Sequence, residues 1–243
     1  MAQSFFIFKG IDCRSMGVIM RGPASIIRPE ERVKHVEIPG RSGDLTETEG
    51  ENIFNSYIRT VSISVRGGFN VREIYKWLRG SGYVTFSGEP DRRQPARVIG
   101  AVTLDKHSHN LDYWTGEVQF YCQPLKEKLQ RETVTITSSG ATVNNNGDVI
   151  SRPMYRLIAS GTTAVLTVTG TGTPSGNSIT VTGLTSSQQI FIDSDTMGVW
   201  NSDGTIEMTN QSTGDFPVLA PGVNTITGSG WSSIEIDKKE RFL

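Results

Sequence analysis

Apolar residues alternate with polar residues through most of this 243-residue chain. In an extended strand successive side chains point to opposite faces, so this period predicts strands with one buried and one solvated face. The first half shows it at residues 61–65, 84–86 and 114–122. Strands with one solvated face are typical of antiparallel sheets. The alternation therefore predicts a mainly β protein.

The second half repeats the alternation in shorter segments. Strands are expected at residues 133–137, 164–169, 178–181 and 188–193, with a closing strand that carries Ile234 and Ile236. Gly, Asn, Ser and Pro mark expected turns at residues 144–147, 173–177 and 203–204. Short, evenly spaced strands with turn signals predict a β-sandwich or jelly roll.

Pro221-Gly222 predicts a type II β-turn near the end of the chain. Proline presets the backbone of the second turn position, and glycine supplies the positive φ of the third. Apolar residues lie on both sides of the pair: Val218, Leu219, Val223 and Ile226. We therefore expect the turn to join two strands of the sandwich.

One segment has the period of a helix. Asn70 is a good N-cap, and a short helix is expected at about residues 71–79, before Gly80 and Gly82. Its apolar stripe is Val71, Ile74, Tyr75 and Leu78. Trp77 falls off that stripe, which suggests the edge of the core or, alternatively, a contact between subunits.

Composition changes near residue 130, which predicts two domains. The amino-terminal domain, at 1–130, is expected to be a β-sandwich or barrel with one helix. The carboxyl-terminal domain, at 131–243, is expected to be a β-sandwich. Residues 1–131 carry 19 Lys and Arg against 15 Asp and Glu, whereas residues 132–243 carry 5 against 10. The basic residues form no run, so the sequence predicts no nucleic-acid specificity. No segment resembles a signal peptide or a membrane span, so we expect no membrane insertion.

Residues 39–55 are polar and have almost nothing to bury, which predicts a long loop or a protruding hairpin arm. Arg41 and Asp44 offer charges there for a partner, with Leu45 as an apolar neighbour. A solvated loop without a partner is the alternative.

The search for chemistry gives no active site. Cys13 and Cys122 lie in apolar patterns and are interpreted as reduced, buried thiols in preference to a disulfide. His107 and His109 are interpreted as part of a surface turn, and Asp193 with Asp195 as acceptors for turn amides. No nucleophile elbow, phosphate loop or dinucleotide motif occurs. The sequence thus predicts no enzyme, cofactor or metal.

Trp200 and Trp231 are candidate glycan contacts, because aromatic side chains form the sugar platforms of many β-sandwich modules. Packing in the core or at its rim is the more ordinary role for both.

Four segments together resemble the distal tail protein (Dit) family of long-tailed bacteriophages. They are residues 6–18, the segment 36–45 with its Ile-Pro-Gly-Arg-Ser-Gly-Asp-Leu run, residues 191–197 and the tract 214–226. No single segment is specific, but the four occur in this order and at this spacing over nearly the whole chain, which makes the combined match fairly specific.

The resemblance implies a structural protein of the virion, assembled in the host bacterial cytoplasm and located at the distal end of the tail. Its amino-terminal domain would form a hexameric ring, and its carboxyl-terminal domain a galectin-like or carbohydrate-binding-module-like sandwich. The implied partners are the tail-tube protein, the tail-tip hub protein, the end of the tape measure and a receptor-binding protein. The alternative function is a tail module that binds host cell-wall polysaccharide.

Overall fold

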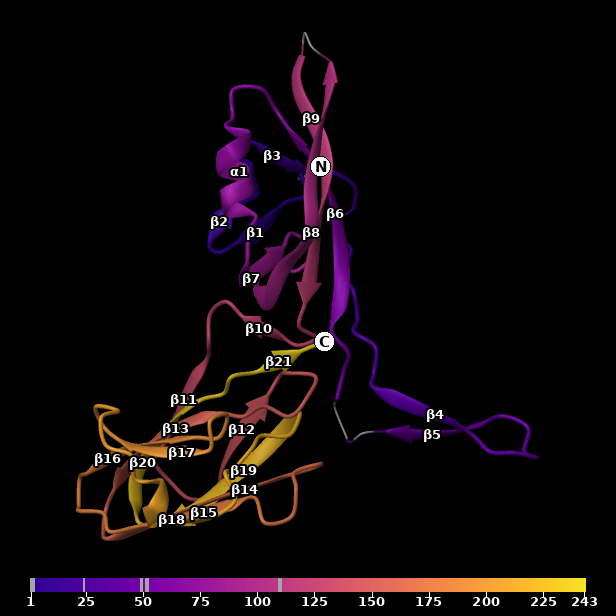
Figure 1. The fold of residues 1–243 in the computed structure, drawn as a ribbon. Helices are drawn as coiled ribbons and strands as arrows, with labels where there is room; N and C mark the ends of the chain where they lie inside the picture. Colours follow the sequence, from indigo (N-terminus) through magenta and orange to yellow (C-terminus); the bar gives the residue numbers. More distant parts are fainter. Residues whose placement is uncertain (1–2, 24, 49, 51–52, 109–110) are drawn as a thin grey trace. The chain divides into compact units, whose positions relative to one another are not determined.

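The computed structural model describes residues 3–23, 25–48, 50, 53–108 and 111–243 (Figure 1). The chain forms two compact units, Met1–Leu129 together with Leu243, and Gln130–Phe242. Strands predominate in both units, which confirms the predicted mainly β fold. In the part of the chain that the structure describes, no helix is long and apolar enough to cross a membrane.

The amino-terminal unit is built on one antiparallel sheet in the order β2-β1-β7-β8-β9-β6-β3. A further strand, β10 (Lys126–Lys128), pairs with β8, and the 3-10 helix η1 (Cys13–Met16) lies between β2 and β3. The strands of the path are β1 (Phe6–Phe8), β2 (Ile11–Asp12), β3 (Val18–Met20), β6 (Tyr57–Val65), β7 (Ser81–Phe86), β8 (Arg92–Ser108) and β9 (Leu111–Cys122).

Aromatic packing shows that this sheet curls around its core. Phe8 on β1 and Phe120 on β9 are three strands apart along the sheet, which is about 14 Å at the usual strand spacing. Their ring centroids nevertheless lie 5.5 Å apart, and those of Phe6 and Phe120 lie 5.4 Å apart. Only a strongly curved sheet brings these side chains together.

The predicted helix is α1 (Val71–Trp77). Asn70 caps it as expected, because its side-chain oxygen accepts a hydrogen bond from the backbone N–H of Arg72 at 3.0 Å. The predicted stripe is partly wrong, since Tyr75 is 39 % exposed. Ile74, Trp77 and Leu78 form the buried face instead, a spacing of i, i+3, i+4.

The carboxyl-terminal unit contains two five-stranded antiparallel sheets. The first has the order β11 (Thr133–Ile136), β20 (Trp231–Asp237), β13 (Met154–Ala159), β16 (Gln189–Asp193) and β17 (Gly198–Asn201). The second has the order β12 (Ala141–Asn145), β19 (Gly222–Ser229), β14 (Thr163–Gly170), β15 (Ser178–Thr182) and β18 (Ser212–Gly214). The 3-10 helix η2 (Thr209–Gln211) and strand β21 (Arg241–Phe242) complete the unit.

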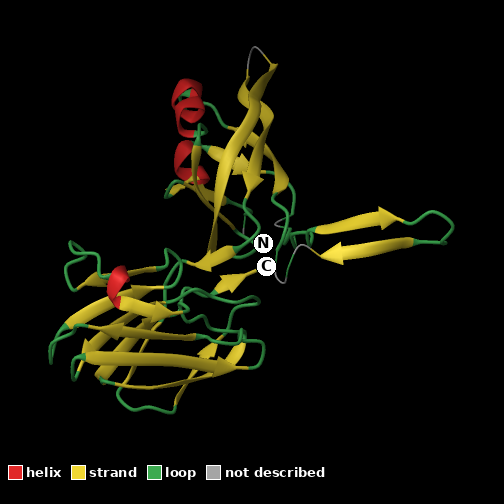
Figure 2. Ribbon diagram, turned by 60° about the horizontal axis from the view of Figure 1, so that its bottom comes forward, coloured by secondary structure: helices red, strands yellow, loops and turns green. Residues whose placement is uncertain are grey.

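Alternating residues of both sheets form one shared core, as a sandwich requires. Ile190 and Ile192 of β16 pack in the same cluster as Leu166 and Val168 of β14. Figure 2 shows the two sheets of this unit as stacked layers of strands. The expected strands at residues 133–137, 164–169, 178–181, 188–193 and 234–236 are all present.

The positive φ expected of Gly222 is confirmed at +87°, with Pro221 in a bend and Gly222 opening β19. The side chain of Asn224, which the sequence analysis overlooked, holds the turn closed. It is fully buried, accepts a hydrogen bond from the N–H of Ala220 at 3.0 Å and donates to the carbonyl of Ala220 at 2.8 Å. An amide side chain thus supplies both bonds to the residue before the turn.

Two expectations about the flanking segments are wrong. Residues 144–147 are not simply a turn, because Asn144 and Asn145 belong to β12 and pair with β19. Val218 and Leu219 form no strand; Leu219 makes only an isolated bridge to Ser151. In both places side-chain amides or a neighbouring strand supply hydrogen bonds that the sequence pattern does not reveal.

Candidate functional site

The candidate arm forms a β-hairpin, one of the two forms that the sequence allowed, but its strands span residues 33–48 and not the expected 39–55. β4 (Val33–Glu37) and β5 (Asp44–Thr48) form a two-stranded sheet of their own (Figure 1). We call residues 33–48 the arm. Every side chain of β5 is exposed, and β4 has only two half-buried positions. An isolated two-stranded hairpin is only marginally stable in water, so the arm has little to hold its conformation within its own chain.

The arm presents apolar surface to solvent. Val36 lies opposite Leu45 in the register, which makes an apolar cross-strand pair. Leu45 is 40 % exposed, and Ile38, which follows β4, is 39 % exposed. These side chains are available for contact with another molecule.

Like charges face each other where the two strands meet the loop. Glu37 and Asp44 are the last cross-strand pair, and both are exposed. Like charges directly opposite each other destabilise a hairpin. The exposed Arg41 lies in the connecting loop, where Gly40 and Gly43 adopt φ of +82° and +81°. The strand register, rather than the sequence pattern, places the two carboxylates together.

Trp77 is a core residue. Its side chain is 6 % exposed, its indole N–H donates to the carbonyl of Phe8 at 2.9 Å, and its ring stacks on Phe6. This burial corrects the sequence analysis, which placed Trp77 off the buried stripe. Little of the side chain is left for a contact between subunits.

The two cysteines are free and fully buried, as predicted. Burial raises the pKa of the Cys122 thiol to about 12 and also raises the pKa of Cys13. Neither thiol has the lowered pKa that a nucleophile or a metal ligand needs.

A partly buried ionic cluster lies near Cys122 in the same unit and was not anticipated. The Glu89 carboxylate contacts Lys126 Nζ at 2.6 Å and an Arg92 nitrogen at 2.9 Å. The Arg59 guanidinium lies over the Phe86 ring and donates to the carbonyl of Ser25 at 2.7 Å. Burial lowers the pKa of Arg59. The cavity among these side chains has a volume of about 10 Å³, which is space for one water molecule.

Of the candidate histidine pair, His107 lies on a strand and not in the expected turn. His107 is exposed on β8, its ring stacked against Tyr113, and His109 lies outside the described residues. In the part of the chain that the structure describes, no group of three or more His, Cys, Asp and Glu side chains is arranged to hold a metal ion.

Asp193 and Asp195 serve the backbone and the carboxyl-terminal segment. The Asp193 carboxylate accepts from the N–H of Asp195 at 3.0 Å, which confirms the structural interpretation. It also pairs with Lys239 Nζ at 2.9 Å, and Asp195 pairs with Arg241 at 3.3 Å. These ion pairs fasten the segment after β20 to the end of β16, a role that spacing in the sequence does not indicate.

The two candidate glycan contacts differ in their surroundings. Trp231 packs against the sandwich core, and its indole N–H donates to the carbonyl of Val165 at 3.1 Å. Packing at the rim of the core is one of the two ordinary roles that the sequence analysis gave this residue. Trp200 lies on β17 opposite Phe191 and is half-buried, with its indole nitrogen close above Gly198.

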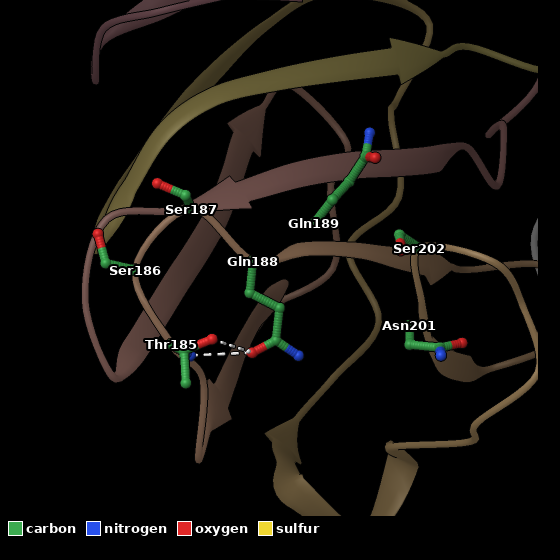
Figure 3. A pocket seen from close by; sticks show the side chains of 7 residues that line it. All are labelled: Thr185, Ser186, Ser187, Gln188, Gln189, Asn201 and Ser202. Atoms are coloured by element: carbon green, nitrogen blue, oxygen red, sulfur yellow. Dashed lines mark hydrogen bonds between the residues drawn. The ribbon is translucent and has the colours of Figure 1, made fainter.

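A polar pocket opens next to Trp200, at the ends of β16 and β17. Its volume is about 540 Å³, and Figure 3 shows its lining side chains. The Gln188 side-chain oxygen accepts from the N–H and the hydroxyl of Thr185, which fixes one wall. All lining residues are uncharged: Thr185, Ser186, Ser187, Gln188, Gln189, Asn201 and Ser202.

No model of a protein family and no curated protein matches this chain. Solved structures do. The crystal structure of the Dit (gp 19.1) protein of phage SPP1 matches with a TM-score of 0.80 and 19 % identity, over 100 % of both chains. A chain in the phage P2 baseplate, in its activated conformation with Ca, matches with a TM-score of 0.51 and 9 % identity, again over 100 % of both chains.

The SPP1 protein is described as a paradigm of the hub adsorption apparatus in phages that infect Gram-positive bacteria. Its likeness to this chain extends over both units, and the four sequence segments that suggested the resemblance are distributed over the same length. The chain therefore has the fold of a phage distal tail protein from end to end.

Proposed function

We propose that this protein is a structural component of a phage tail hub. In this proposal residues 1–130 form the ring-forming domain and residues 131–243 a galectin-like domain. Six copies form a ring that joins the tail tube to the tail-tip hub protein around the end of the tape measure and supports host attachment. The observation that carries the proposal is the match to the SPP1 Dit fold over the full length of both chains.

The arm supports a role in assembly. It exposes Leu45 and Ile38, and its paired carboxylates Glu37 and Asp44 repel each other when no cation faces them. A basic or polar surface on a neighbouring subunit would relieve that repulsion and cover the apolar side chains. A closed ring offers each subunit such a neighbour through a repeated, head-to-tail interface. We therefore assign Arg41, Asp44 and Leu45 to the subunit contact.

Mass measurement of the purified protein in solution, together with negative-stain imaging, tests the ring. Six copies of the 26.6 kDa chain give a particle of about 160 kDa with a central opening. A protein that stays monomeric at every concentration, and shows no ring on tail particles, contradicts the proposal.

A substitution in the arm tests where the subunit contact lies. Leu45→Asp places a charge on exposed arm surface, so the monomer is expected to fold normally while ring assembly weakens by about tenfold or more. Thr48→Asp, also exposed but at the other end of β5, is the matched control. If rings form and both variants assemble like the wild type, the ring proposal stands and the arm assignment is wrong.

A further inference from the structure

A row of large side chains crosses the outward face of the first sheet of the carboxyl-terminal unit. The register pairs Trp200 with Phe191, Phe191 with Arg156, and Arg156 with Glu235. Four adjacent strands thus each contribute one residue to a continuous line. Three strand spacings make this line about 14 Å long.

Burial shows which way the row points. Its strand neighbours Ile190, Ile192 and Val199 are at most 1 % exposed and belong to the sandwich core. Because side chains alternate along a strand, Phe191 and Trp200 lie on the opposite, outer face. The side chains of Arg156 and Glu235 are 45 % and 37 % exposed. The row is therefore partly exposed within its own unit, with Phe191 and Trp200 half-buried.

The row combines apolar faces with fixed hydrogen-bonding groups. The Arg156 guanidinium lies 5.0 Å from the Phe191 ring centroid, and its Nη1 contacts a Glu235 oxygen at 2.9 Å. The ion pair and the ring hold Arg156 in place, and its side chain keeps 45 % exposure, with further N–H donors besides the one that contacts Glu235. Glu235 offers further acceptor capacity at the end of the row.

The polar pocket continues the same face. Gln189 precedes Phe191 by two residues on β16, so its side chain lies on the same outer side, and Ser202 follows β17 directly in the turn beside it. Both line the pocket, whose walls carry only hydroxyls and amides (Figure 3). The aromatic pair and a pocket rich in uncharged donors and acceptors thus lie on neighbouring parts of the same β16–β17 pair.

We propose that this face binds a neutral oligosaccharide chain. Sugar rings have apolar C–H faces that stack on aromatic side chains, and hydroxyl rims that pair with amides, hydroxyls and an Arg–carboxylate pair. The pocket walls carry no cation for a phosphate or sulfate, and the cation of the row, Arg156, is already paired with the Glu235 carboxylate. Trp231 takes no part, because it is packed against the core and its N–H bonds to Val165. The site is separate from ring formation and goes beyond it.

Binding of the full-length protein to a panel of immobilised oligosaccharides tests the site. The panel contains neutral chains of glucose, galactose and N-acetylglucosamine, with a sulfated dextran as the anionic probe. We expect binding to one or more neutral chains, and about a tenfold loss in Trp200→Ala and in Gln189→Ala. Tyr121→Ala, which removes an exposed aromatic residue of the other unit, is the matched control and is expected to bind like the wild type.

Three results overturn the proposal: no binding of the wild type to any neutral chain, binding only to the sulfated chain, and neutral binding that is unchanged in Trp200→Ala. Circular dichroism of each variant separates lost binding from lost folding. If Trp200→Ala unfolds, Gln189→Ala, at a pocket wall outside the core, still decides the outcome. Ring formation, measured on the same samples, is independent of every one of these results.

Discussion

Two hairpins of the amino-terminal unit illustrate opposite uses of the same motif. The β8–β9 hairpin is built into the sheet, and β9 contributes Val118, Phe120 and Cys122, all fully buried. The arm has the same antiparallel pairing but buries none of its described side chains. Backbone hydrogen bonds are therefore common to both, whereas hydrophobic burial distinguishes them. The β8–β9 hairpin is stabilised by burial within its own chain, whereas the arm lacks that stabilisation.

The largest expected contrast is in stability. Phe120→Ala removes a ring that packs edge-on against Phe6, Phe8 and Phe86, so it is expected to lower the free energy of unfolding by about 3–5 kcal/mol. Leu45→Ala in the arm is expected to change it by less than about 0.5 kcal/mol. Urea denaturation of both variants measures the difference. Similar losses in the two would mean that the arm is packed against its own chain in solution.

A smaller effect is expected from the buried Cys122 thiol of β9, which makes the stability of the fold depend on pH. Burial raises the pKa of Cys122 to about 12, whereas a thiol in an unfolded chain titrates near 8.5. Because the folded pKa is the higher one, the neutral thiol stabilises the fold fully below about pH 8.5, and this contribution is lost as the pH rises toward 12.

The Cys122→Ala variant isolates that contribution. The difference in unfolding free energy between the wild type and this variant is expected to shrink from pH 8 to pH 10.5 in urea titrations. A difference that stays constant over this range would show that Cys122 is not buried in the folded protein.

The smallest expected effect lies in the arm itself. Asp44→Asn removes the repulsion opposite Glu37 and is expected to stabilise the pairing of β4 with β5 by about 0.2–1 kcal/mol. Amide hydrogen exchange at Val36 and Leu45 in the monomer measures it as slower exchange. Glu47→Gln is the matched control, because it removes an opposite-charge pair with Lys34 and is expected to speed exchange. Equal exchange in both variants would indicate that the register is different in solution.

Local signals account for much of what was predicted correctly. The alternation located the main strands, Asn70 located the start of the helix, and Pro221-Gly222 located a turn with positive φ at Gly222. Each of these depends on the preferences of a few neighbouring residues. The buried state of both cysteines followed in the same way from their apolar surroundings.

The errors lie where distant residues decide. Tyr75 was expected to be buried and is exposed, whereas Trp77 was expected off the buried stripe and is buried. The reason is that the residues of β1 cover the face of the two-turn helix that carries Trp77. Asn144 and Asn145 extend a strand instead of turning, because β19 supplies their partners. Asn224 and the ion pairs of Asp193 and Asp195 hold segments that local propensity leaves undefined.

The sequence by itself determined that the protein is mainly β, with one capped helix, two halves of different composition and a polar segment that has almost nothing to bury. Only the tertiary structure decided how surfaces are composed. It placed Glu37 opposite Asp44, and it aligned Trp200, Phe191, Arg156 and Glu235 across four strands. The physical reason is that propensity acts between neighbours along the chain, whereas strand register is fixed by the packing of a whole sheet on its core.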